Sequence, residues 1–286
     1  MDFNLLLENL TNPALLFFVL GILAVYLKSD LEIPQNSSKF ISLYLLFAIG
    51  FKGGQELSHE SYTAEIGWSM VLGLLISVSI PLYAFFILKR KFSVFDAGAI
   101  AAAYGSVSAV TFITAVTFLE SQEMKLHGHM VAIMALMEAP AIIVGLLLIS
   151  LFNKDEHDRI QKRSALRHSF TNGSVLLIVG SLLIGYFANA KQAEGIKPFT
   201  NDLFKGFLAI FLLDMGVTSG RKLKAFFSFG WFPVLFGLII PLVNGCVVAV
   251  LSSLVTEDVA NRFIFAILAA SASYIAVPAA MKISVP

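Results

Sequence analysis

The stretch Ala101-Ala-Ala-Tyr-Gly-Ser-Val-Ser-Ala-Val-Thr111 places small and hydroxyl-bearing residues in the middle of an otherwise apolar segment. A counterpart, Ala269-Ala-Ser-Ala-Ser-Tyr-Ile-Ala-Val-Pro278, lies near the end of the chain, and each stretch contains a Ser-x-Ser pair. At mid-membrane depth, hydroxyls, small residues, glycine and proline are typical of a helix that breaks and offers its backbone to a ligand. We therefore expect both segments to be discontinuous helices.

The composition is too apolar for a soluble domain. Of the 286 residues 57% are hydrophobic and 14% are charged, and the mean hydropathy is +0.82, whereas soluble domains carry about a quarter charged residues. A net charge of +1 argues against a nucleic-acid partner, which would require a concentrated basic face. The single cysteine, Cys246, excludes an intrachain disulfide, and we expect it to be a small packing residue. The composition predicts an all-α polytopic membrane protein in contact with a lipid bilayer.

Nine apolar segments are long enough to span a membrane once tilt is allowed for. They cover residues 13–28, 40–55, 66–88, 96–119, 126–152, 172–189, 203–220, 229–255 and 260–283. Short cytoplasmic loops are rich in Lys and Arg, and most of the 20 basic residues fall on one side if the N-terminus is outside. We therefore predict a cell (inner) membrane protein with its N-terminus outside and the polar linker 153–171 in the cytoplasm.

The two halves of the chain share short matches in the same order. The matched sets are Gly21 and Tyr26 with Gly180 and Tyr186, Gly50 and Gly54 with Gly216 and Gly220, and Ser106-Val-Ser108 with Ser271-Ala-Ser273. An odd number of spans in each copy turns the second copy upside down in the membrane. We predict two inverted five-helix repeats, residues 1–152 and 172–286, each with a discontinuous helix. The partner of span 126–152 would follow Pro286, so a tenth helix is expected beyond the printed sequence.

In such a repeat the broken helices meet near the bilayer midplane, where the N-terminal ends of half-helices present N–H groups with partial positive charge. The predicted anion-binding residues are Gly105, Ser106, Ser108, Ser271 and Ser273, since glycine admits close backbone approach and serine hydroxyls donate hydrogen bonds. No basic residue reaches the middle of either broken span, which predicts a small, singly charged substrate. Helix–helix hydrogen bonding by small polar residues is the alternative interpretation.

Oxygen ligands for a hard monovalent cation are expected nearby. Pro278 frees the backbone carbonyl near Tyr274, and Tyr104 and Thr111 supply hydroxyls. Glu138 lies in mid-span, where an ionisable group is costly unless it faces a ligand, water or a partner, so we predict a role in cation coupling or gating.

Two further acids are less distinctive. Asp96 begins a span, and a role at the helix N-terminus is expected. Asp214 lies towards the inner end of its span, where pairing with Lys52 is one alternative to a functional role.

Enzyme chemistry is not expected. The five histidines, His59, His127, His129, His157 and His168, map to loops or span ends, and no hydrolase, P-loop or dinucleotide motif occurs. The spacing of His127-Gly-His129 does not place two ligands on one helix face, so no metal other than a coupling cation is predicted, and no cofactor.

Five motifs in order resemble the sodium-dependent bicarbonate transport family of permeases, the SbtA type. They are Gly50-Phe-Lys-Gly-Gly54, Tyr104-Gly-Ser-Val-Ser-Ala-Val-Thr111, Met137-Glu-Ala-Pro140, Leu213-Asp-Met-Gly216 and Ala269-Ala-Ser-Ala-Ser-Tyr-Ile-Ala-Val-Pro278. The resemblance implies ten spans, a core domain (spans 3, 4, 5, 8 and 9) that moves against a gate domain (spans 1, 2, 6 and 7), and a trimer. It also implies sodium and bicarbonate at the helix crossing, and a PII-like regulator at the cytoplasmic face.

The chain departs from the cyanobacterial pattern at Glu138 and Tyr274, where those members carry Asp, and in its shorter linker 153–171. The sequence thus predicts a sodium-coupled symporter for bicarbonate or a similar small monoanion that works by alternating access. A sodium- or proton-coupled carrier of a small organic anion and a passive anion channel are the alternatives.

Overall fold

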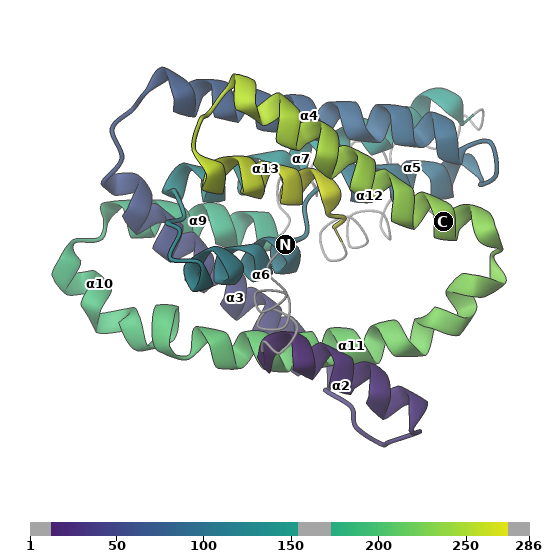
Figure 1. The fold of residues 1–286 in the computed structure, drawn as a ribbon, viewed down its shortest axis with the longest axis horizontal. Helices are drawn as coiled ribbons and strands as arrows, with labels where there is room; N and C mark the ends of the chain where they lie inside the picture. Colours follow the sequence, from purple (N-terminus) through teal and green to yellow (C-terminus); the bar gives the residue numbers. More distant parts are fainter. Residues whose placement is uncertain (1–12, 154–172, 274–286) are drawn as a thin grey trace. The chain divides into compact units, whose positions relative to one another are not determined.

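The computed structural model describes residues 13–153 and 173–273, which form helices and no strand (Figure 1). The helices are α2 (Pro13–Tyr26), α3 (Gln35–Ser58), α4 (Ala64–Leu88), α5 (Val94–Gly105), α6 (Ala109–Ser121), α7 (Gly128–Phe152), α9 (Gly173–Phe187), α10 (Ala190–Lys197), α11 (Phe204–Ser228), α12 (Trp231–Leu251) and α13 (Val259–Ala270). A π-helical turn η2 (Pro198–Asp202) precedes α11, and a 3₁₀ turn η3 (Ser252–Leu254) follows α12. The all-α prediction is confirmed for this part of the chain.

The helices have the length and composition of a multi-pass membrane protein. Among the described residues, five helical stretches are long and apolar enough to cross a bilayer: Ala64–Leu88, Val94–Ser121, Gly128–Phe152, Ala190–Ser228 and Trp231–Leu254. Leu15–Tyr26, Leu176–Phe187 and Val259–Ala270 are shorter apolar helices. Large apolar side chains on α12, among them Leu238, Leu242 and Val250, are more than 60% exposed. Exposed apolar surface of this kind is suited to lipid.

Two details differ from the sequence prediction. The span predicted at 40–55 is a 24-residue helix, α3, whose polar ends were not included in the apolar segment. Cys246 is exposed on α12 rather than packed inside.

The chain divides into two compact units. Unit 1 comprises Met1–Ala48 and Asn189–Leu238, and unit 2 comprises Ile49–Ala188 and Ile239–Pro286. Helix α9 belongs to unit 2, whereas the sequence analysis assigned span 172–189 to the gate domain. The assignment of spans to gate and core domains stays a prediction.

In unit 1, α2 packs along α11 through two glycines. A Cβ on Gly21 would lie 2.3 Å from the backbone oxygen of Leu213, and one on Gly216 would lie 2.1 Å from that of Phe18. Small residues at such contacts let helix backbones approach closely, which favours helix association in lipid. Only glycine fits at these two positions without moving the helices apart.

In unit 2, α4, α5 and α7 pack against one another. Ala102 of α5 meets Ile142 and Ile149 of α7 in a buried apolar cluster. A Cβ on Gly145 would lie 2.5 Å from that of Ala102, so α5 and α7 are in close backbone contact. This packing fixes the helix that carries the first Ser-x-Ser stretch.

The second half of α3 packs against α9 in the same way. A Cβ on Gly54 would lie 2.1 Å from the Leu182 carbonyl oxygen, and one on Gly185 would lie 2.2 Å from that of Phe51. Gly50 and Gly216, which the sequence alignment of the two halves pairs, both lie at such contacts. A Cβ on Gly50 would lie 2.9 Å from the Ile178 carbonyl oxygen of α9, and Gly216 admits the backbone of α2 in the same way.

We expect Gly54→Ala to lower the free energy of unfolding by about 1–3 kcal/mol, because the added methyl meets backbone atoms that cannot rotate away. Thermal unfolding of the purified protein in detergent measures the change. Gly180→Ala on α9 is the matched control, since nothing lies within 4 Å of its added Cβ. Equal melting temperatures for the two variants would show that the α3–α9 contact is not tight.

Candidate functional site

The first Ser-x-Ser stretch interrupts a membrane helix. Helix α5 ends at Gly105, and Ser106 caps it in an extended conformation with its N–H bonded to the Ala102 carbonyl. Ser108 then caps the N-terminus of α6, where its hydroxyl oxygen accepts a hydrogen bond from the Thr111 N–H at 3.1 Å. The predicted break is therefore present, because residues 106–108 separate the end of α5 from the start of α6.

The second stretch ends a helix in the same manner. Ser271 caps the C-terminus of α13 in an extended conformation, and its hydroxyl donates to the Leu268 carbonyl at 3.0 Å. Residues from Tyr274 onwards lie outside the described part, including the predicted ligand Tyr274 and Pro278. The helix that would follow this break is therefore not described.

The two stretches are joined by a pair of hydrogen bonds, which we call the crossing. The Ser108 N–H donates to the Ser271 hydroxyl oxygen at 3.1 Å. In return the Ser273 N–H donates to the Ala103 carbonyl at 2.8 Å. The sequence analysis predicted that the two Ser-x-Ser pairs meet, and the structure brings them into direct contact.

All four serines of the two Ser-x-Ser stretches are buried. The exposed fraction of Ser106, Ser108, Ser271 and Ser273 is 6% or less. The Ser106 hydroxyl has no hydrogen-bond partner among the described residues. A buried hydroxyl without a partner is unfavourable, so the arrangement leaves a donor free for a small ligand.

Gly105 lies directly against α4. A Cβ on Gly105 would be 2.0 Å from Pro81 Cγ and 3.1 Å from the Ser77 carbonyl oxygen. Pro81 has no N–H, so the helical hydrogen bond that the Ser77 carbonyl would accept is missing. The break therefore lies beside a backbone oxygen that has lost its helical partner. The free Ser77 carbonyl was not predicted from the sequence, although a proline inside an apolar segment is a visible signal of such a group.

The predicted cation ligands lie on three elements. Tyr104 is half-buried on α5. Thr111 is exposed on α6, and its hydroxyl donates to the Ser108 hydroxyl oxygen at 2.9 Å. Glu138 is buried on α7, and its Oε2 has no partner among the described residues. Glu138 thus lies on a neighbouring helix rather than on a broken segment.

Asp96 and Asp214, the two further acids of the sequence analysis, each accept a hydrogen bond from a serine. Asp96 lies in the first turn of α5, where it accepts a hydrogen bond from the Ser93 hydroxyl at 2.7 Å, as expected for an acid at a helix N-terminus. Asp214 accepts a hydrogen bond from Ser38 within unit 1. The alternative partner considered for Asp214, Lys52, forms an ion pair with Glu120.

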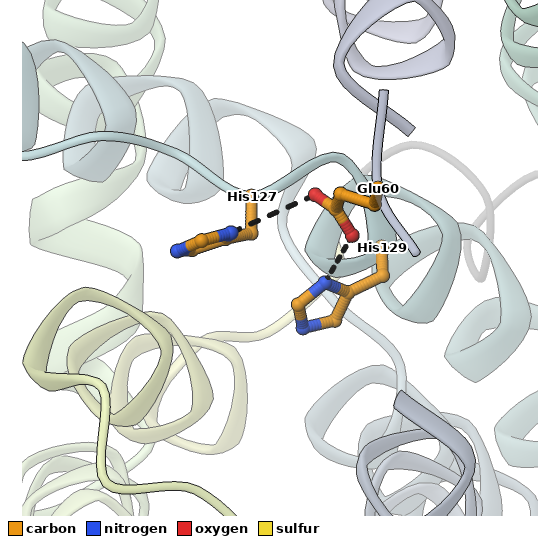
Figure 2. A group of neighbouring side chains, drawn as sticks. All are labelled: Glu60, His127 and His129. Carbon is orange, nitrogen blue, oxygen red and sulfur yellow. Dashed lines mark hydrogen bonds and ion pairs between the residues drawn. The ribbon is translucent and has the colours of Figure 1, made fainter. Parts of the chain in front are cut away.

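His127 and His129, for which no metal was predicted, lie together with Glu60, which had not been considered from the sequence (Figure 2). Glu60 Oε2 is 2.7 Å from His129 Nδ1, and Glu60 Oε1 is 3.7 Å from His127 Nδ1. The prediction that His127-Gly-His129 does not bind a metal was based only on the spacing of ligands along one helix face. His127 is the extended N-cap of α7 and His129 lies in its first turn, so both rings reach a carboxylate from another loop.

The Glu60 carboxyl group is charged at neutral pH. Partial burial by itself raises its pKa, but the hydrogen bond and charge of His129, the Gly128 N–H and the charge of His127 outweigh burial, and the pKa lies below its usual value. The cluster therefore combines an anionic oxygen with two imidazoles.

Comparison with known proteins gives a family assignment. Residues 13–286 match the model of the Na⁺-dependent bicarbonate transporter superfamily. No curated protein matches the chain significantly. The family match covers nearly the whole chain, including both Ser-x-Ser stretches. The chain therefore belongs to the Na⁺-dependent bicarbonate transporter superfamily, a family of membrane transporters.

Proposed function

We propose that the protein is a sodium-coupled symporter that imports bicarbonate or a similar small monoanion by alternating access. The observation that carries this proposal is the crossing, where the two Ser-x-Ser stretches hydrogen-bond to each other and their four serines are buried. Family membership supports sodium and bicarbonate as the transported ions.

The anion is held at Gly105, Ser106, Ser108, Ser271 and Ser273. The unpartnered Ser106 hydroxyl donates to the anion, and the N-terminus of α6 adds a partial positive charge. A site made of hydroxyls and helix ends holds one negative charge weakly, which suits a substrate that must also be released.

Sodium is held by oxygens near the same place. Tyr104, Thr111, Glu138 and Tyr274 are the proposed ligands, and the Ser77 carbonyl beside Gly105 is a further oxygen of the required kind. The buried Glu138 carboxyl supports the coupling role, because burial of a charge is costly unless a cation offsets it. The sodium charge in turn offsets that of the anion, which links the two binding events.

Alternating access requires two repeats of opposite orientation. The matched glycine contacts of α3 with α9 and of α2 with α11 support this symmetry. So do the starts of the broken segments: Ser93 caps α5 by accepting from the Asp96 N–H, and Asp258 caps α13 by accepting from the Asn261 N–H. In this proposal the repeats are residues 1–152 and 172–286.

The proposal includes a cellular setting. Lys and Arg in the connections favour an inner-membrane protein with its N-terminus outside and the linker 153–171 in the cytoplasm. The resemblance of the motifs to SbtA-type permeases extends the proposal to a trimer and to a PII-like regulator at the cytoplasmic face.

We expect Ser106→Ala to reduce sodium-driven uptake of labelled bicarbonate into proteoliposomes by roughly 10- to 100-fold, the effect of losing one hydrogen bond to a charged group. The melting temperature should not change, because the Ser106 hydroxyl has no partner among the described residues. The double variant Ser106→Ala with Ser271→Ala should abolish uptake.

Ser69→Ala is the matched control, because Ser69 is also a buried serine whose hydroxyl has no partner among the described residues. Wild-type uptake by Ser106→Ala would contradict the assignment of this hydroxyl to the substrate. Uptake that saturates but ignores the sodium gradient would contradict symport, and flux that never concentrates the anion would indicate a channel.

We expect Glu138→Gln to weaken the sodium dependence of uptake by at least about tenfold, because the amide keeps the size of the side chain but lacks its charge. Glu138→Asp, which keeps the charge, should retain sodium-driven uptake. The measurement is the initial uptake rate as a function of sodium concentration at fixed bicarbonate. An unchanged sodium dependence in Glu138→Gln would remove Glu138 from the coupling mechanism.

A further inference from the structure

The Glu60, His127 and His129 cluster is gathered by a close contact between two chain segments. The Gly128 N–H donates to Glu60 Oε1 at 2.6 Å. A Cβ on Gly128 would lie 2.2 Å from the Leu57 backbone nitrogen, so the N-terminus of α7 is pressed against the end of α3. This contact places the two histidines on either side of one carboxylate.

One potential ligand atom from each of the three residues lies within 4.8 Å of the others. A tetrahedral zinc ion with ligands at about 2.0–2.1 Å separates its ligand atoms by about 3.3 Å. The Nδ1 of His127 already lies 3.7 Å from Glu60 Oε1, and the Nδ1 of His129 lies 2.7 Å from Glu60 Oε2. Small side-chain rotations would therefore open a place for an ion.

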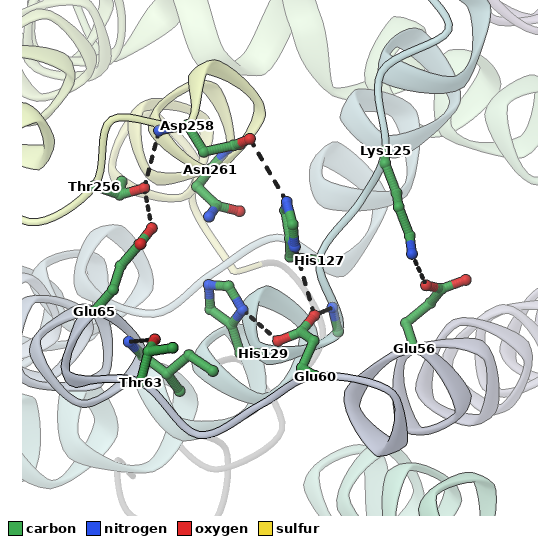
Figure 3. Close-up of polar contacts among 12 residues, drawn as sticks. Glu56, Glu60, Thr63, Glu65, Lys125, His127, His129, Thr256, Asp258 and Asn261 are labelled. Atoms are coloured by element: carbon green, nitrogen blue, oxygen red, sulfur yellow. Dashed lines mark hydrogen bonds and ion pairs between the residues drawn. The ribbon is translucent and has the colours of Figure 1, made fainter.

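The surrounding groups fit a metal site (Figure 3). His127 Nε2 is 3.6 Å from Asp258 Oδ2, and a metal-bound histidine usually donates its second N–H to a carboxylate. His129 is 97% buried, and its Nε2 has no partner among the described residues. The nearby Lys125 forms an ion pair with Glu56 at 2.9 Å, and the Glu56 carboxylate offsets the positive charge of the lysine. Because the His129 imidazole is buried and faces the Glu60 carboxylate, the cluster is not simply a group of solvated surface side chains.

We propose that Glu60, His127 and His129 form a binding site for a divalent transition metal of the zinc, cobalt or nickel class. Two imidazoles and one carboxylate are the ligands that this class prefers, whereas Mg²⁺ and Ca²⁺ require mostly oxygen. Three protein ligands leave a position for water. The ion ties the α3–α4 connection to the start of α7 and, through Asp258, to the start of α13. This site is separate from the proposed transport of bicarbonate, and its test does not depend on uptake.

The test is Co²⁺ titration of the purified, tag-free protein after chelator treatment, followed by visible absorption. We expect saturable binding of one ion per chain and a spectrum typical of low-coordinate cobalt. His127→Ala and Glu60→Gln should each weaken binding by at least about tenfold, and Asp258→Asn by roughly 10-fold through the lost partner of His127. Zn²⁺ should displace Co²⁺ and raise the melting temperature of the wild type.

His59→Ala is the matched control, because His59 is an exposed neighbour of Glu60 outside the cluster. This variant should bind Co²⁺ with the affinity of the wild type. Glu60→Gln keeps an oxygen that accepts from the Gly128 N–H, and Asp258→Asn keeps the helix cap, so both variants should fold. Absence of saturable Co²⁺ binding, or equal affinity in the wild type, His127→Ala and Glu60→Gln, would overturn the proposal.

Discussion

The two hydrogen bonds of the crossing are the interaction that joins the Ser-x-Ser stretches of unit 2. A broken helix leaves backbone groups without their usual partners, and inside a bilayer no bulk water is present to satisfy them. Here the two Ser-x-Ser stretches each satisfy a backbone N–H of the other, since Ser108 donates to Ser271 and Ser273 donates to Ala103. The two Ser-x-Ser stretches therefore depend on each other for these hydrogen bonds.

Close helix packing holds the crossing in place. Gly105 brings the break against Pro81 of α4, and the contact of Gly145 with Ala102 holds α5 against α7. Because helices in lipid gain little from the hydrophobic effect, such van der Waals contacts and hydrogen bonds supply much of their association energy. The same device recurs in the contacts of α3 with α9 and of α2 with α11. The crossing is thus surrounded by closely packed helices, and the buried Glu138 lies on one of them.

The sequence predicted the helical spans and the meeting of the serines, because apolar segment length and a repeated small-residue pattern carry both signals. It did not predict the full length of α3, since the ends of that helix are polar. It also missed the Glu60, His127 and His129 cluster, because Glu60 is distant in sequence from the two histidines and meets them through the contact at Gly128. For the cation ligands, the sequence indicated suitable residue types but not where their side chains lie in the fold. Thr111 proved to be exposed and bonded to Ser108, while Tyr274 lies outside the described residues.

The central claim is that both broken segments form one site, so that neither binds substrate alone. It is tested most directly by the equilibrium dissociation constant of bicarbonate in saturating sodium for the wild type, Ser106→Ala, Ser271→Ala and the double variant. One shared site predicts that each single variant binds at least about tenfold more weakly, and that the two effects depart from additivity by more than about 0.5 kcal/mol. Wild-type affinity in Ser271→Ala, or strictly additive effects, would contradict the account.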